Sequence, residues 1–237
     1  MSAGGSAGGS AGGSVGGSAG RNTRVKIASF VVGPFQENCY LVADEAAGKG
    51  VLVDPGDDGD RLLDAVERAG VSLEAIWLTH AHLDHIGGIA AIKRRIDVPV
   101  YLHADDRVMY SYAPQAAAMY GVPFELGPLP DRTFTEGDTV SVGALTFTVW
   151  HMPGHAPGHV VLHGHGVAFG GDVLFAGSVG RTDLPMSDGA AFQRTLERVS
   201  TLPPSTVVYP GHGPATTIGE ELASNPFLTG LARPVRR

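Results

Sequence analysis

The sequence predicts a four-layer αββα sandwich, in which two β-sheets pack face to face and helices cover their outer faces. Strand-like and helix-like segments alternate along the chain in two similar halves, and each half ends a strand in a histidine. A hydrophobic content of 43% and a mean hydropathy of +0.06 are ordinary for a globular enzyme. This length and composition suit one domain with one sizeable core.

Residues 1–20 repeat the tetrapeptide Ser-Ala-Gly-Gly, with Val15 as the exception. Such sequence has nothing apolar to bury and behaves as flexible coil. We therefore expect residues 1–20 to be a disordered tail or linker, and residues 21–237 to form the single folded domain.

In the first half, apolar runs predict strands at residues 25–32, 39–42, 50–54, 75–79 and 100–102. A helix over residues 60–69 places Leu62, Leu63 and Val66 on one face, and Gly70 follows as its terminator. A second helix covers residues 88–95. The segment 104–129 begins as a helix and is expected to break up at its prolines, from Pro114 onward.

In the second half, strands are predicted at residues 139–142, 145–150, 160–163, 167–170 and 206–209. A helix is predicted over residues 190–200, and a short final helix near Thr217. Apolar strands in this half end at glycine or proline and then present a single histidine or aspartate. Loops at the ends of strands are where rigid scaffolds carry functional sites.

The net charge of −7, from 17 basic and 24 acidic residues, disfavours partners such as nucleic acid or an anionic membrane surface. The single cysteine, Cys39, permits no intrachain disulfide and no cysteine-based zinc cluster, and a buried apolar role is expected for it. No apolar run is long enough to span a membrane. We therefore expect a cytoplasmic protein that acts on a small molecule.

The strongest motif is Thr79-His80-Ala81-His82-Leu83-Asp84-His85-Ile86-Gly87-Gly88. His80 and His82 point to the same side of an extended chain, and Asp84 and His85 follow where the chain turns. One such residue alone is explained as a polar loop residue or a helix cap. Four of them within six positions indicate a metal site. His155, Asp172 and His212 follow later strands and complete the pattern.

These residues, with the motifs Asp54-Pro-Gly, Gly-Asp172-Val-Leu-Phe, Gly180-Arg-Thr-Asp and Asn225-Pro-Phe, resemble the metallo-β-lactamase superfamily over about residues 25–228. Within it the chain is most similar to the glyoxalase II (hydroxyacylglutathione hydrolase) group, in its short bacterial form. The resemblance implies the metallo-β-lactamase fold and a metal-dependent thioester hydrolase. The implied substrates are S-(2-hydroxyacyl)glutathiones such as S-lactoylglutathione, from methylglyoxal detoxification.

Carried over residue by residue, the resemblance implies two divalent metal ions, with zinc favoured and iron or manganese as alternatives. His80, His82 and His155 hold one ion, Asp84, His85 and His212 hold the other, and the catalytic carboxylate of Asp172 bridges both. A hydroxide shared by the ions attacks the thioester carbonyl, because nearby dications lower the pKa of water. Asp84 is a second catalytic candidate, as a proton acceptor.

The glutathione pocket is expected to carry over only in part. Arg181 takes the position of a lysine that contacts glutathione in the family, and Pro214 replaces a family tyrosine. We expect Arg181 to bind a substrate carboxylate, although a surface ion pair with Asp183 explains it nearly as well. His159 either orients a metal-binding side chain or is structural, and Asp54 either supports the site or only forms a turn.

Three alternatives remain on the sequence alone. The first is another hydrolase with the same metal centre, such as a lactonase or esterase. The second is a mono-iron persulfide dioxygenase, which would use His80, His155 and Asp172. The third is a non-catalytic binding module, which the complete set of candidate ligands disfavours. The oligomeric state is not predicted.

Overall fold

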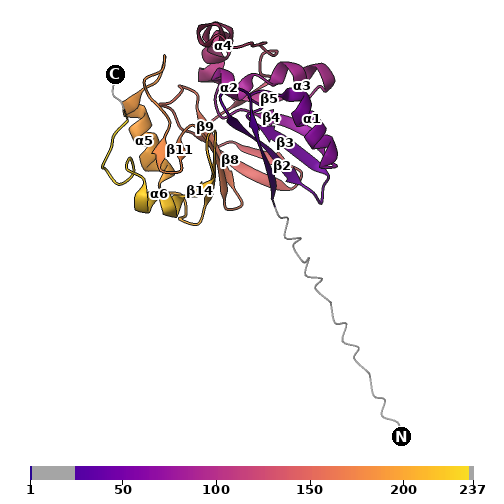
Figure 1. Cartoon of the computed structure of the whole chain (residues 1–237). Coiled ribbons are helices and arrows are strands. Elements are labelled where there is room, and N and C mark those ends of the chain that lie inside the picture. Colours follow the sequence, from indigo (N-terminus) through magenta and orange to yellow (C-terminus); the bar gives the residue numbers. More distant parts are fainter. Residues whose placement is uncertain (2–24, 235–237) are drawn as a thin grey trace.

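The computed structural model describes Met1 and residues 25–234. The predicted tail, Met1 apart, lies outside the described residues. No helix in the described part is long and apolar enough to cross a membrane. Figure 1 shows two sheets side by side, with α1 and α3 outside the first and α5 and α6 outside the second. The predicted αββα sandwich is confirmed.

The first sheet has the strand order β1-β2-β3-β4-β5-β6. Its strands are β1 (Lys26–Val32), β2 (Glu37–Asp44), β3 (Lys49–Val53), β4 (Ser72–Trp77), β5 (Val100–His103) and β6 (Arg132–Phe134). The pairs β1–β2 and β2–β3 are antiparallel, and the remaining pairs are parallel. The helices of this half are α1 (Gly59–Arg68), α2 (Leu83–Ile86), α3 (Ile89–Arg95) and α4 (Arg107–Tyr120), with a 3₁₀ turn at Ala104–Asp106.

The second sheet has the order β14-β13-β10-β9-β8-β7. Its strands are β7 (Thr139–Val142), β8 (Leu145–His151), β9 (Val160–Gly164), β10 (Val167–Gly171), β13 (Val207–Pro210) and β14 (Thr216–Thr217). Only the β10–β13 pair is parallel. A small hairpin joins β11 (Leu174–Phe175) to β12 (Ser178–Val179), and α5 (Gly189–Val199) and α6 (Ile218–Ser224) complete this half.

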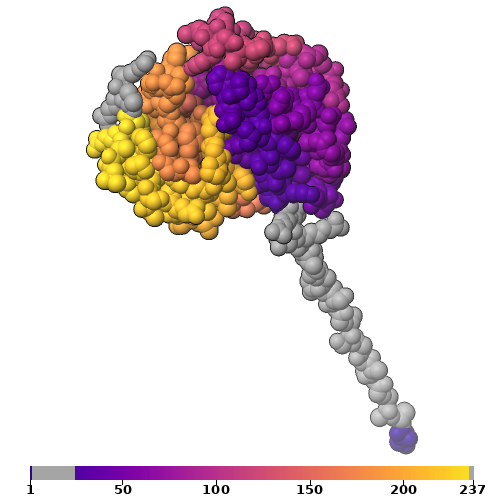
Figure 2. All heavy atoms as spheres, in the orientation of Figure 1, coloured from indigo at the N-terminus to yellow at the C-terminus, as the bar shows by residue number. Residues whose placement is uncertain are grey.

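Three apolar cores separate the four layers, because successive side chains of a strand point to opposite faces of its sheet. In β2, Cys39 and Leu41 face the core under the helices of the first half. Tyr40 and Val42 of the same strand face the core between the sheets. A third core joins the second sheet to α5 and α6. In Figure 2 the indigo-to-purple first half and the orange-to-yellow second half meet directly.

The sequence-based prediction for the middle segment was wrong. Helix α4 does not break at Pro114 but continues to Tyr120, and Gly121 then ends it in the left-handed region with φ 67°. Proline lacks an N–H group, so it removes one hydrogen bond from a helix interior. Buried residues of α4 on both sides of Pro114, such as Met109 and Ala117, pack against the first core and offset that loss.

Candidate metal centre

The first half contributes its candidate ligands from one loop and one short helix. Strand β4 ends at Trp77, and the chain leaves the sheet through a loop that carries His80 and His82. Helix α2 then presents Asp84 and His85 from adjacent positions. Helix α2 lies tightly against Gly56: a Cβ atom at Gly56 would lie 1.6 Å from the carbonyl oxygen of Asp84.

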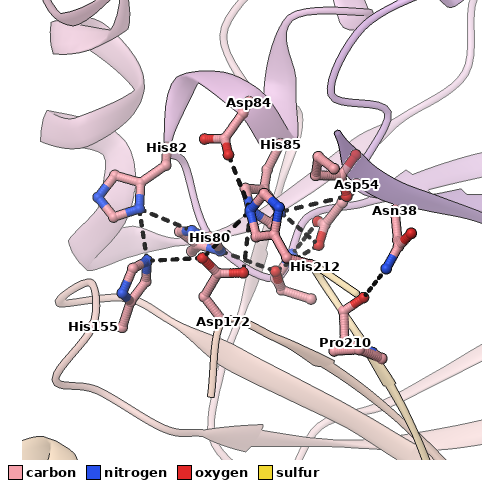
Figure 3. A network of polar contacts seen from close by, with 12 residues as sticks. Asn38, Asp54, His80, His82, Asp84, His85, His155, Asp172, Pro210 and His212 are labelled. Atoms are coloured by element: carbon pink, nitrogen blue, oxygen red, sulfur yellow. Dashed lines mark hydrogen bonds and ion pairs between the residues drawn. The ribbon is translucent and has the colours of Figure 1, made fainter. Parts of the chain in front are cut away.

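The second half contributes one side chain from each of three loops. His155 lies between β8 and β9, Asp172 follows β10, and His212 follows β13. All seven side chains converge at the edge where the two sheets meet, as Figure 3 shows. Gly211 is required there, because a Cβ atom at that position would lie 2.2 Å from Oδ1 of Asp172.

His80, His82 and His155 form a first group. Nδ1 of His82 lies 3.0 Å from Nε2 of His80 and 2.8 Å from Nε2 of His155. Ligand atoms 2.0–2.1 Å from a tetrahedral ion are separated by about 3.3 Å, so these nitrogens lie close to the spacing of a metal site.

Asp84, His85 and His212 form a second group. Nε2 of His212 lies 3.2 Å from Oδ2 of Asp84, and Nε2 of His85 lies 4.0 Å from the same oxygen. The carboxylate of Asp172 stands between the two groups. Its Oδ2 lies 3.4 Å from Nε2 of His155, and its Oδ1 lies 3.5 Å from Nε2 of His85.

The charges favour metal binding in the first group. Burial, together with the neighbouring histidines, lowers the pKa of His80 well below its usual value and that of His82 to about 3. Their imidazoles are therefore neutral and keep a free lone pair at physiological pH. Burial by itself raises the pKa of Asp172, but the nearby His85 and His155 lower it by more. The net pKa lies below its usual value, so this carboxylate is ionised.

The donor set fits two divalent cations. Within each group the ligand atoms lie within 4.8 Å of one another. Nε2 of His85 and Oδ1 of Asp172 are buried and have no hydrogen-bond partner, which is costly unless a cation lies between them. Imidazoles and carboxylates without a thiolate suit borderline divalent ions such as zinc, iron or manganese.

Neighbouring side chains fix the orientation of the histidine rings. Nδ1 of His85 lies 3.1 Å from Oδ2 of Asp54, a carboxylate that also accepts hydrogen bonds from the backbone N–H and the hydroxyl of Thr79. Nδ1 of His155 donates to the carbonyl of Arg181 at 2.8 Å. His159 stacks on His80 with ring centroids 4.8 Å apart and accepts the N–H of Asp172. Asp54 and His159 thus contact the candidate ligands directly.

Sequence reasoning missed the residues that hold the His212 loop. Asn38 of β2 donates to the carbonyl oxygen of Pro210 at 3.1 Å (Figure 3). It also donates to the carbonyl oxygen of Gly213 at 2.8 Å. The hydroxyl of Tyr40 donates to the same Pro210 carbonyl at 2.6 Å. The polar Glu37-Asn38 pair inside an apolar strand was the available signal.

Asp106 is the second omission. Its side chain is buried, and its two carboxylate oxygens accept one backbone N–H each, from Ala81 at 2.8 Å and from Gly158 at 2.5 Å. Ala81 lies between His80 and His82, and Gly158 lies in the loop that carries His155. One carboxylate therefore ties together the two loops that supply the first group.

Another cluster of possible ligands consists of His103, Asp105 and His151. The two imidazole rings stack with centroids 4.0 Å apart and planes at 11°. Imidazole lone pairs lie in the ring plane, so one ion between stacked rings would be far out of both planes. This geometry suits packing rather than metal binding.

A pocket of about 440 Å³ opens directly onto the candidate centre. Its lining includes His82, Asp84 and Asp172 on one side and the α4 helix on another. Arg181 also lines this pocket, while its guanidinium is paired with Asp183 through two hydrogen bonds of 2.6 and 2.7 Å. The ion pair expected as an alternative for Arg181 is thus present, at the wall of the pocket.

An αββα sandwich with clustered histidines and aspartates at the junction of its sheets defines a class of metal-dependent enzymes. A family model of the metallo-beta-lactamase superfamily matches residues 32–212. Hydroxyacylglutathione hydrolase GloC of Haemophilus influenzae is 37% identical over 203 residues, which cover 83% of this chain and 95% of that protein. The chain belongs to the metallo-β-lactamase superfamily.

Solved structures agree with this assignment. TTHA1623 in a di-iron-bound form is 44% identical with a TM-score of 0.78, over 85% of this chain and 100% of that one. The B3 metallo-beta-lactamase BLEG-1 is 37% identical with a TM-score of 0.81, over 86% and 100%. ETHE1 from Myxococcus xanthus is 29% identical with a TM-score of 0.74, over 86% and 85%.

Proposed function

We propose that this protein hydrolyses thioesters, with S-(2-hydroxyacyl)glutathiones such as S-lactoylglutathione as substrates and two zinc ions as its resident metals. The observation that carries this proposal is the position of the Asp172 carboxylate between two complete groups of ligands, beside an open pocket. The similarity to a hydroxyacylglutathione hydrolase supports the substrate class. Iron and manganese fit the same donor set.

The first group would hold one ion, the second group the other, and Asp172 would contact both. When bound, the two ions lower the pKa of a water molecule and polarise the thioester carbonyl. Asp84 has an 18% exposed side chain at the pocket and a carboxylate oxygen near His212. It is placed to accept the proton that water loses as its oxygen bonds to the carbonyl carbon. The carbon–sulfur bond then breaks, and the sulfur leaves as a thiol that takes the proton which Asp84 accepted.

The direct test combines metal analysis with turnover. We expect about two metal ions per chain and hydrolysis of S-lactoylglutathione that stops on chelation and returns when zinc is added. Absence of thioester hydrolysis by the fully loaded protein would rule the proposal out. A parallel panel of lactones, esters and a β-lactam tests the other hydrolytic activities that this kind of centre supports.

A persulfide dioxygenase is the second candidate, because the ETHE1 likeness favours it. That reaction needs one iron, held by residues in the positions of His80, His155 and Asp172. The second group, with Asp84, His85 and His212 all turned toward one point, has no role in such a centre. Oxygen uptake with glutathione persulfide, together with one iron per chain, would favour the dioxygenase over the hydrolase.

Arg181 is the expected contact for a substrate carboxylate. Arg181 lines the pocket and its side chain is 59% exposed, so solvent weakens any ion pair that it makes. We expect Arg181→Ala to raise KM for S-lactoylglutathione about five- to tenfold with little change in kcat. The reason is that the lost contact stabilises the bound substrate and the transition state equally. Steady-state kinetics measure this, and Arg181→Lys, which keeps the charge, is the control. An unchanged kcat/KM in Arg181→Ala would remove the role.

A further inference from the structure

The pocket beside the candidate centre has an unusual composition for a site that receives a charged peptide thiol. Apart from the proposed metal ligands, Ser178 and Arg181, every residue that lines it is apolar or aromatic. The volume of about 440 Å³ is much larger than the methyl group of a lactoyl substituent requires. Most of the wall is therefore available to an apolar group of substantial size.

Helix α4 builds one side of this pocket. Met109, Ala113 and Ala116 follow the spacing of one helix face and all line the pocket. The two alanines leave room where larger side chains would fill it. Phe175, from the β11–β12 hairpin, also lines the pocket.

The same helix exposes large side chains at the pocket. Tyr112, Met119 and Tyr120 line it while remaining 38%, 76% and 54% exposed. Phe35 packs edge-on against Tyr120, with ring centroids 5.5 Å apart. Exposed apolar side chains that gather at one concave site are typical of a ligand-binding surface.

The charges lead to the same conclusion. A glutathione thioester carries two carboxylates and one ammonium group, whereas the pocket offers one guanidinium, which already binds Asp183. Burying ionised groups without partners is costly, so the peptide part of the substrate stays near solvent. The pocket interior is left for the acyl group.

We propose that this site selects thioesters with a long or bulky apolar acyl group, which lies along α4 in contact with Ala113, Ala116 and Met119. The proposal rests on the proposed thioester hydrolase function and specifies its substrate class. Each methylene group buried against this wall makes a roughly constant favourable contribution to the free energy of binding.

A series of S-acylglutathiones from acetyl to octanoyl tests the proposal, with S-lactoylglutathione in the same assay. We expect kcat/KM to rise about fourfold per added methylene until the pocket is filled. A profile that is flat or falls with chain length, while S-lactoylglutathione is cleaved, overturns this inference and leaves the proposed function standing. If no thioester is cleaved, the proposed function itself fails.

Two variants locate the effect on α4. Ala116→Leu narrows the pocket. It is expected to lower the ratio of kcat/KM for the octanoyl thioester to kcat/KM for the acetyl thioester about tenfold. The matched control is Ala118→Leu, on the same helix but exposed and outside the pocket lining, which leaves that ratio unchanged. Met119→Ser changes an exposed residue, so its folding is not at risk, and it should also lower the ratio. An unchanged ratio in both pocket variants contradicts the proposal.

Discussion

Replacing Asp172 with alanine is expected to lower kcat for S-lactoylglutathione by at least about a thousandfold, equivalent to about 4 kcal/mol of transition-state stabilisation. The reason is geometric. Its carboxylate faces His155 on one side and His85 on the other, so its removal takes away the charged group that lies between the two groups of ligands. The variant should also retain fewer than the two metal ions per chain expected for the wild-type protein.

The measurement is single-batch metal analysis followed by steady-state kinetics on the same protein. Asp97→Ala is a suitable control, because that carboxylate is 97% exposed and pairs only with Lys93 among the contacts described. The control should keep full metal content and turnover. Normal turnover in Asp172→Ala would mean that this carboxylate does not take part in the reaction, and the mechanism would have to be abandoned.

Replacing Asp106 with alanine is expected to lower the free energy of unfolding by about 2–5 kcal/mol, since two buried N–H groups lose their acceptor. Burial raises the pKa of Asp106, the N–H groups of Gly158 and Ala81 oppose this effect, and the net result is a pKa of about 6. Because these donors lie in the loops of the first group, we also expect weaker metal binding there. The second group, which Asp106 does not contact, should keep its ion.

Metal titration against a chromophoric chelator, which gives a separate affinity for each of the two ions, tests this selectivity, alongside chemical denaturation of the metal-free protein. Asp106→Asn keeps the shape but has one acceptor oxygen, so its effect should be intermediate. The neighbouring and exposed Asp105→Asn is the control. Equal weakening of both metal sites in Asp106→Ala would show that the residue stabilises the fold in general and does not position the first group.

Much of the fold could be predicted from local sequence. Apolar runs located the long strands. Leu62, Leu63 and Val66 located α1, because burial on one face of a helix imposes a period. The short strands β6, β11, β12 and β14 were missed, since two or three residues carry no period. Helix α4 was predicted to break at Pro114, because propensity is local whereas the packing of Met109 and Ala117 is tertiary.

The candidate ligands could be proposed from the sequence because they follow the ends of apolar strands and match a recognisable motif. The supporting residues were not. Asn38 acts on Pro210, 172 positions away, and Asp106 acts on Gly158, 52 positions away. Such partners follow from how strand β2 and the 3₁₀ turn pack against the second half, which no local pattern records. The apolar lining of the pocket likewise depends on α4, whose length was predicted wrongly from the sequence.

The division of the ligands between the halves has a consequence for assembly. His80, His82, Asp84 and His85 come from the first half of the chain, whereas His155, Asp172 and His212 come from the second. Each bound cation would therefore have ligands from both halves and would cross-link them at their common edge. Metal binding and the packing of the two halves against each other then depend on one another. When metal is scarce, the contact between the halves should therefore loosen before either sheet unfolds.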